Sequence, residues 1–287
     1  MPDIELHQLE QPYGELRIVA PERQRSLLAS LAADGQQSPV QVVEHGQGRP
    51  VLIDGYRRAL ALEALGRDTV SAIVLPFDEA EALVQWHRQE RVTRRSAMEE
   101  AWLLRALIEQ HRIGQSELAR RLGHTQSWIS RRLGLLTALP ETVQELVRKG
   151  LLPPYSATKF LVPMARAITS DCEALAAALA GHSLSTRQME RLYVAWRSSD
   201  EEGRARLVTQ PLLFLKAGDE LARLEPSHPD AALVKDLDAL GTICRRVRRR
   251  LSRRARSPEL PEGLVRLWPG TQQSLDALRG LMEERLR

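Results

Sequence analysis

The segment between Gln115 and Leu136 constrains the fold most, because small, flexible and apolar residues follow one another in it at fixed intervals. Ala119 is small enough to let two helices cross closely, and Gly123 suits the turn that must come four residues later. Ile129, six residues further on, can pack back against the first helix. The spacing therefore predicts a helix-turn-helix. The other apolar residues of the predicted seam are Leu118, Leu122 and Leu133.

The predicted second helix, from Gln126 to Leu136, carries groups on its outward positions that can recognise DNA. In a helix-turn-helix the first half of this helix enters the major groove, where glutamine can pair with adenine and arginine with guanine. Each bidentate pair contributes about 1–3 kcal/mol of discrimination against a wrong base. An ordinary helical hairpin with polar outer faces is the alternative. The predicted DNA-binding residues are Gln115, Thr125, Gln126, Ser127, Ser130, Arg131 and Arg132, the last of them at a phosphate.

The distribution of charge along the chain favours a polyanionic partner for this segment. The formal net charge is only +4, but residues 1–86 contain 7 Lys and Arg against 13 Asp and Glu, whereas residues 87–159 contain 13 against 7. An acidic front followed by a cationic middle is typical of a module that meets a nucleic acid. A solvated basic face is the alternative.

Composition limits the class of protein. A length of 287 residues predicts two or three compact units, and 43% hydrophobic residues are enough to form a core. The two cysteines, Cys172 and Cys244, have no spacing typical of a disulfide framework or a zinc site, which favours a reducing, cytoplasmic setting. We find no stretch of about 18 apolar residues and no signal-like start, so we expect neither secretion nor a membrane partner.

Strand and helix patterns alternate in the front of the chain, whereas the sequence from Asp78 onward has helical periodicity. We therefore expect an α+β protein, in which a small mixed α/β domain precedes an all-α helix-turn-helix domain and a helical C-terminal region. The expected domains are residues 1–80, 81–168 and 169–287. Polar stretches at 198–203 and 252–263 are expected to be linkers or long loops. In the front domain we predict helices over 21–34 and 56–65 and strands over 40–43, 50–53 and 69–75.

A second candidate site lies at the junction of a predicted strand and helix, in the sequence Asp54-Gly-Tyr-Arg-Arg58. The free N–H groups of a helix start favour an anion, Gly55 lets the backbone come close, and Arg57 and Arg58 add donors for phosphate. The alternative is a helix capped by Asp54, with two surface arginines.

The order of these motifs over residues 3–165 resembles the ParB family of chromosome and plasmid partition proteins. The resemblance implies a front domain that binds CTP with Mg²⁺ and closes as a clamp on DNA. It also implies a homodimer that reads a short palindromic site, with a ParA-type ATPase as partner and a nucleoid or plasmid location. The nucleotide-binding residues that it implies are Gly35, Pro39, Gly55, Tyr56, Arg57 and Arg58. The motifs that carry it are Leu27–Gly35, Gly35–Pro39, Asp54–Arg58, Met98–Ala101, the helix-turn-helix and Leu139–Gly150.

The sequence departs from the family where metal chemistry would occur. Tyr56 replaces the glutamate of the Gly-Glu-Arg-Arg box, and His87 stands where a second box begins with glutamate. Because Mg²⁺ prefers anionic oxygen ligands, CTP hydrolysis, nucleotide binding without turnover and no nucleotide binding all stay open. The arginines of this second stretch contact the DNA backbone or form a solvated basic helix. They are Arg88, Arg91, Arg94 and Arg95.

Three functions remain open from the sequence. The first is a site-specific DNA-binding protein that acts in partition or as a regulator on a plasmid or mobile element. The second is a nuclease or phosphoryl-transfer enzyme built on the front fold, for which Asp54 is the one candidate carboxylate. The third is a transcriptional repressor whose front domain binds no nucleotide. Eight arginines between Arg245 and Arg256 bind phosphates without sequence preference or belong to a solvated dimer arm.

Overall fold

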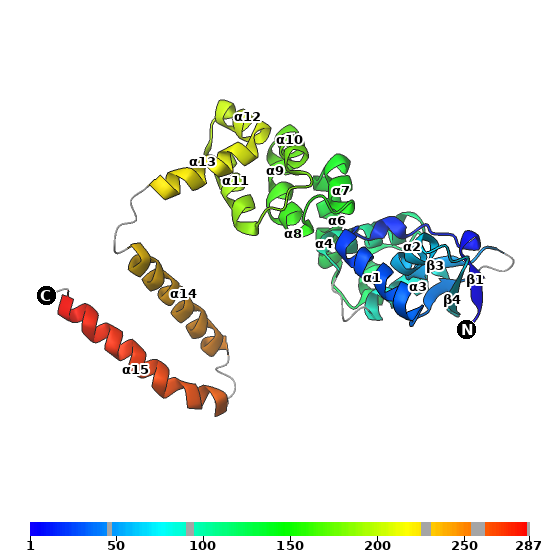
Figure 1. Ribbon diagram of the computed structural model, residues 1–287, viewed down its shortest axis with the longest axis horizontal. Helices are drawn as coiled ribbons and strands as arrows, with labels where there is room; N and C mark the ends of the chain where they lie inside the picture. The colour runs from blue at the N-terminus through cyan, green and yellow to red at the C-terminus, as the bar shows by residue number, and fades with distance from the viewer. Residues whose placement is uncertain (45–47, 90–94, 225–230, 254–261, 286–287) are drawn as a thin grey trace. The chain divides into compact units, whose positions relative to one another are not determined.

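The computed structural model describes residues 1–44, 48–89, 95–224, 231–253 and 262–285. The chain forms two compact units, residues 1–221 and 222–287 (Figure 1). The first unit contains a four-stranded sheet and the helix-turn-helix, which confirms the expected α+β class. The predicted division into three domains stays a prediction.

A small mixed sheet forms the front of the first unit, with strand order β1-β4-β2-β3. Strands β2 (Val40–Val43) and β3 (Val51–Asp54) form the predicted antiparallel hairpin. Strand β4 (Thr69–Val74) runs parallel to β2, and a helix crosses between them, as parallel pairing requires. Strand β1 (Asp3–Glu5) was not predicted, because three residues are too few to show a two-residue alternation.

Three helices accompany this sheet. Helix α1 (Pro21–Asp34) begins at its proline as predicted, and α2 (Tyr56–Ala64) packs on α1 and on strands β2 and β4. Helix α3 (Glu79–Gln89) contacts both β3 and the first helix of the helix-turn-helix, so it joins the front of the unit to the DNA-binding motif. Their apolar residues form one continuous core with those of the motif.

Helix α4 (Ala97–Glu109) separates two hydrophobic cores. Leu103 and Leu107 belong to the core shared with the sheet, whereas Met98 and Trp102 belong to a second core formed by the following helices. A capping box fixes its start, where the Ser96 hydroxyl accepts from the Glu99 N–H and the Glu99 carboxylate accepts from the Ser96 N–H.

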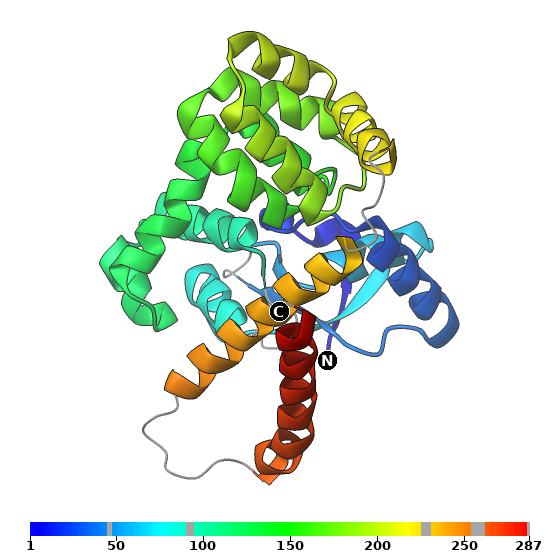
Figure 2. The same cartoon turned by 90° about the vertical axis from the view of Figure 1, so that its left-hand side faces the viewer.

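The second core is formed mainly by helices, and Figure 2 shows these helices packed together beside the sheet. The predicted linker at 198–203 is wrong: α11 ends at Ser198, α12 begins at Glu201, and Asp200 caps the second helix through the Gly203 N–H. Asp200 is therefore a helix-capping residue and not part of a linker. The helices of this region are α7 (Glu141–Arg148), α8 (Pro154–Ser156), the π-helix Ala157–Leu161, α9 (Val162–Ala167), α10 (Thr169–Leu179), α11 (Thr186–Ser198), α12 (Glu201–Thr209) and α13 (Pro211–Leu224).

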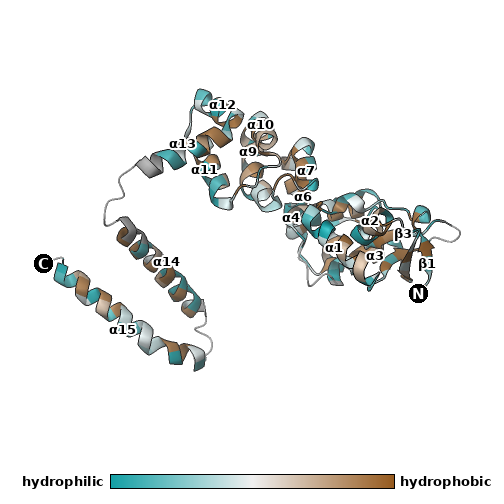
Figure 3. Cartoon of the chain, in the orientation of Figure 1, coloured by the Kyte–Doolittle hydropathy of each residue, from teal (hydrophilic) through white to brown (hydrophobic). Residues whose placement is uncertain are grey.

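The second unit contains two long helices, α14 (Ala231–Arg253) and α15 (Glu262–Arg285). Apolar residues lie along both helices, as the colouring in Figure 3 shows, and several of them are exposed, including Val247, Leu251 and Leu267. The predicted loop at 252–263 lies mostly outside the described residues. Within the described part of the chain, we find no helix with both the length and the apolar character that crossing a membrane demands.

Candidate nucleic-acid and phosphate-binding sites

The structure confirms the predicted seam of the helix-turn-helix. Helices α5 (Gln115–Leu122) and α6 (Gln126–Ala138) pack through Leu118 and Ile129, which are both fully buried. Gly123 ends α5 in the left-handed conformation, with φ 69° and ψ 31°, as the turn requires. The two helices therefore have a fixed relative geometry.

Side chains at the start of α6 face solvent. The Thr125 hydroxyl accepts from the Trp128 N–H at 3.2 Å, so Thr125 caps the helix, and its side chain is exposed. The next exposed side chains have no hydrogen-bond or ion-pair partner among the described residues. They are Gln126, Ser127, Ser130 and Arg131. This arrangement presents amide, hydroxyl and guanidinium groups that a partner molecule can reach.

Arg132, also predicted to contact DNA, has partners within the protein. Its Nε donates to Glu100 on α4 at 2.6 Å, and its guanidinium lies 5.0 Å from the centre of the Trp128 ring. Trp128 in turn stacks on His124 in the turn, with ring centres 3.8 Å apart. These contacts fix α6 on α4. Gln115, at the start of α5, is half-buried and lies beside Ser130 at a surface groove.

At the second candidate site, Gly55 occupies a position that other residues do not tolerate. Its φ is 105°, and a Cβ atom there would lie 2.5 Å from Val40 Cγ1. The glycine thus lets strand β2 and the start of α2 pack closely together, and it is itself buried. Asp54 does not cap α2 as predicted, because its carboxylate accepts from Arg58 Nη2 at 2.8 Å and from Trp86 Nε1 at 3.1 Å.

The Tyr56 side chain, predicted to contact a nucleotide, lies in the core. Its hydroxyl donates to the Leu52 carbonyl at 2.5 Å and accepts from the Tyr13 N–H at 3.1 Å. Burial raises the pKa of the Tyr56 hydroxyl well above its ordinary value, so it stays protonated. The tyrosine that stands in place of the family glutamate therefore lies in the interior.

Arg58 holds the loop that precedes β2. Its Nη1 donates to the Ser38 carbonyl at 2.9 Å and to the Pro39 carbonyl at 2.5 Å. From the other side, the Gln36 amide donates to the Ser71 carbonyl and accepts from the Ser71 N–H, both at 2.8 Å. The loop with Gly35 and Pro39 is therefore rigidly placed next to the start of α2, and Arg58 supplies much of that rigidity.

Arg57 belongs to a cluster of cations. Its Nη2 donates to the Ile18 carbonyl at 3.4 Å, and burial together with the charges of Arg23 and Arg17 lowers its pKa. The Glu99 carboxylate, 3.8 Å from Arg17 Nη1, offsets part of this repulsion, and an entering anion would relieve more of it. Arg17 also lies over the Trp86 ring, 4.7 Å from its centre. Arg17 and Trp86 were not predicted as site residues, because neither belongs to a recognisable motif.

The region of the second family box is aromatic and cationic. Arg95 is buried against the Trp86 ring at 3.8 Å, and its Nη1 lies 3.2 Å from His87 Nδ1. Burial, Arg95, His124 and Arg17 lower the pKa of His87 to about 4, so its imidazole is neutral at pH 7. The prediction that Arg95 faces DNA is wrong, since it is buried. Arg88 is exposed, and Arg91 and Arg94 lie outside the described residues.

The side chains around Asp54 and His87 do not suit Mg²⁺ as ligands. The carboxylate of Asp54 is bonded on both oxygens, and the neutral His87 ring is bonded to a guanidinium. Among the described residues, no three His, Cys, Asp or Glu side chains come together as a metal site would need. We therefore derive no step through a metal ion. Cys172 is also no candidate nucleophile, because burial raises the pKa of its thiol to about 12.

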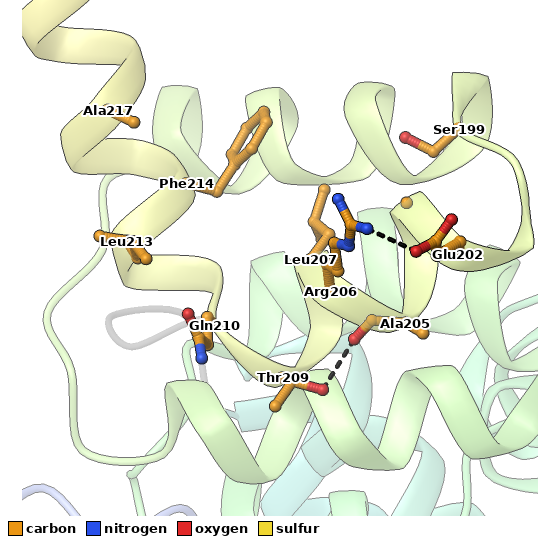
Figure 4. Close-up of a pocket in the computed structure, with 11 residues that line it drawn as sticks. Ser199, Glu202, Ala205, Arg206, Leu207, Thr209, Gln210, Leu213, Phe214 and Ala217 are labelled. Atoms are coloured by element: carbon orange, nitrogen blue, oxygen red, sulfur yellow. Dashed lines mark hydrogen bonds and ion pairs between the residues drawn. The ribbon is translucent and has the colours of Figure 1, made fainter.

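A groove of about 890 Å³ lies on α12 and α13. Figure 4 shows Leu207, Leu213 and Phe214 along it, with Arg206 paired to Glu202. An apolar lining whose arginine is already ion-paired is unsuited to a phosphate, so this groove is not a second nucleotide candidate.

Comparisons with known proteins agree with the geometry. A model of the ParB N-terminal domain matches residues 2–86, and a model of the ParB HTH domain matches residues 93–198. The nucleoid occlusion protein of Halalkalibacterium halodurans is 36% identical over 130 residues, which are 44% of each chain. That of Bacillus subtilis is 33% identical over 153 residues, 51% of this chain and 52% of the relative. The chain thus spans about half the length of these relatives.

Two solved structures of the C-terminally truncated chromosome-partitioning protein ParB from Caulobacter crescentus also match. The complex with CTP-gamma-S is 23% identical, covers 62% of this chain and 97% of that chain, and has a TM-score of 0.29. The complex with the centromeric parS site is 24% identical, covers 68% and 99%, and has a TM-score of 0.33.

Proposed function

This chain belongs to the ParB family, and from that premise we propose that it is a sequence-specific DNA-binding protein of the partition and nucleoid occlusion type. One observation carries the proposal: the start of α6 exposes Gln126, Ser127, Ser130 and Arg131, while Ile129 on the same helix is fully buried against α5. Exposed recognition groups on a rigid support are what reading base edges requires, because the helix must enter the groove without rearranging.

Gln126 and Arg131 carry base recognition in this proposal. The Gln126 amide offers a donor and an acceptor to adenine, and the Arg131 guanidinium offers paired donors to guanine. The hydroxyls of Ser127 and Ser130 and the cap at Thr125 place the helix against phosphates and sugars. Arg132 acts through its ion pair with Glu100, which orients α6.

We propose that the protein binds as a homodimer at a palindromic site, because a two-fold axis in the protein matches one in the DNA. The exposed apolar residues of α14 and α15 supply the surface for the second copy. Nucleoid or plasmid association follows from the DNA site. A ParA-type ATPase is the partner that the family implies, and regulation of nearby genes is the alternative outcome of the same binding.

The start of α2 is proposed to bind the phosphates of CTP without turnover. The support is the rigid loop at Gly35–Pro39, the helix start at Tyr56 and the cation cluster around Arg57. Arg58 and Tyr56 act here as structural residues. Hydrolysis is not proposed, because the nearby acidic groups are already bonded to the protein.

Selection of bound fragments from genomic DNA tests the DNA-binding function. We expect the full chain to enrich one inverted-repeat motif, with protection of both half-sites in a footprint. Recovery of fragments with no shared motif would contradict the proposal. The genes that flank the enriched sites separate partition from gene control, since partition sites cluster at one locus and operators precede the genes that they regulate.

Calorimetry with CTP tests the nucleotide site. We expect heat of binding from the wild type, and its loss in Arg57→Ala, because the cation cluster loses its central member. Arg67→Ala is the matched control, since Arg67 is an exposed arginine just beyond the other end of α2. Absence of heat with the wild type would favour a repressor with a nucleotide-free front domain.

A further inference from the structure

A groove of about 500 Å³ lies beside α6, the proposed recognition helix. Residues of the helix-turn-helix and of a later helix line it together. Gln115 of α5 and Ser130, Gly134 and Thr137 of α6 line it, together with Arg166 of α9. Helix α9 follows the π-helix Ala157–Leu161 and packs on α6, so it is not part of the motif. The groove therefore adds a cation from outside the motif to the face that meets DNA.

Gly134 is a lining residue of this groove and has no side chain to fill it. It lies in the interior of α6 at an ordinary helical φ, where glycine is less favourable than alanine. A Cβ atom at this position would meet nothing within 4 Å, so neither packing nor backbone conformation requires glycine. A glycine here leaves room for a ligand to come close to the backbone of α6.

Arg166 is placed to meet an anion in the groove. It is exposed and has no hydrogen-bond or ion-pair partner among the described residues. Its neighbours Met164 and Ala165 are buried in the second core, which fixes the part of α9 from which the guanidinium projects. The described lining of the groove contains no carboxylate that would compete for this cation.

We propose that this groove receives the sugar-phosphate backbone of a DNA strand next to the bases read by α6, with Arg166 as the phosphate contact. The inference rests on the proposed DNA-binding function and adds a contact outside the motif. The second half of a recognition helix leaves the major groove toward the backbone, so a cation facing that half meets a phosphate. The Gln115 amide and the Ser130 hydroxyl are neutral donors for the same backbone.

The salt dependence of binding to the selected duplex tests Arg166. Each phosphate contact changes the slope of log K against log salt by about 0.9, so Arg166→Ala should reduce the slope by about that amount. We expect a three- to tenfold loss of affinity near 0.15 M salt, and near wild-type values from Arg166→Lys. Arg197→Ala is the matched control, because Arg197 is exposed on α11 and lines no described groove.

Gly134→Gln tests the floor of the groove independently of charge. Glutamine favours the helix, so we expect Tm to rise by about 1–4 °C while affinity for the selected duplex falls at least tenfold. A variant that is more stable yet binds more weakly excludes misfolding as the cause.

The failure of this inference differs from failure of the proposed function. Wild-type slope and affinity in both Arg166→Ala and Gly134→Gln, with sequence-specific binding intact, would overturn the groove contact alone. Equal losses from Arg166→Ala and Arg197→Ala would also overturn it, because they would indicate general charge attraction. No specific binding by the wild type would overturn the proposed function itself.

Discussion

The starts of α2 and α6 look alike in sequence and differ in the structure. Each begins within three residues after a glycine and carries polar or cationic residues that suit an anion or DNA. At α6, Gln126 and Arg131 are exposed and bonded to nothing described in the protein, whereas at α2 the side chains of Tyr56 and Arg58 are bonded to backbone of the front domain. Side chains without protein partners are available for a ligand, and bonded ones set the shape of the site.

Residues far away in the sequence cause this difference. The Asp54 carboxylate accepts a hydrogen bond from Trp86, which lies 32 positions later in the sequence. The Tyr56 hydroxyl accepts one from the backbone of Tyr13, 43 positions earlier. At the start of α6, by contrast, Gln126 and Arg131 have no bonded partner among the described residues, and the distant contact of this helix is made by Arg132 with Glu100. A pattern at a helix start therefore predicts a ligand contact only where no distant side chain reaches it.

The largest expected effect concerns the support beneath α6. Ile129→Ala removes a fully buried side chain from the seam and should lower the free energy of unfolding by about 2–5 kcal/mol. Chemical denaturation measures this loss, and DNA affinity should fall with it because α6 is no longer fixed. A loss below 0.5 kcal/mol would mean that the seam does not position the recognition helix.

The next effect compares an arginine from each helix start. Arg58→Ala removes donors to the Ser38 and Pro39 carbonyls and leaves Asp54 without its cation, so we expect a loss of about 1.5–3 kcal/mol in unfolding free energy. Arg131→Ala should change stability by less than about 0.5 kcal/mol, because its side chain is exposed. Equal losses of stability from Arg58→Ala and Arg131→Ala would contradict the claim that only the first arginine has a structural role.

His87, between the two sites, predicts a pH dependence of stability. Its pKa is lowered to about 4 in the folded chain from an ordinary 6.5, so the unfolded chain binds more protons below pH 6.5. Its contribution is therefore complete above that pH and is lost as pH falls toward 4, about 2 kcal/mol of it between pH 7 and pH 5. Denaturation at both pH values measures the loss. His87→Gln should remove this part of the slope, and an unchanged slope would contradict the assignment.

Much of the fold could be predicted from local patterns. The helix over 21–34, the hairpin and the crossing at Ala119 and Ile129 follow from residues within a few positions of one another. The strand at Asp3–Glu5 and the capped turn at Asp200 could not be predicted, because a short strand depends on its partner and capping residues resemble loop residues.

The sequence predicted where the residues of the candidate sites lie better than it predicted what each of them contacts. The exposed residues of α6 lie where the motif indicates, since the motif itself fixes their direction. The roles of Arg58 and Arg132 depend on Pro39 and Glu100, which only the folded chain brings near. Gly134 and Arg166 needed the groove between α6 and α9 to become visible as a pair.

The most direct test of the central claim compares the DNA sequences selected by the wild type and by Gln126→Ala with Arg131→Ala. Both proteins are incubated with the same randomised duplex library, after circular dichroism has shown equal helical content. We expect the wild type to select one palindromic motif, and the variant to keep salt-dependent binding while losing preference at the contacted bases. Selection of the same motif with the same strength by both proteins would contradict the claim that the start of α6 reads DNA.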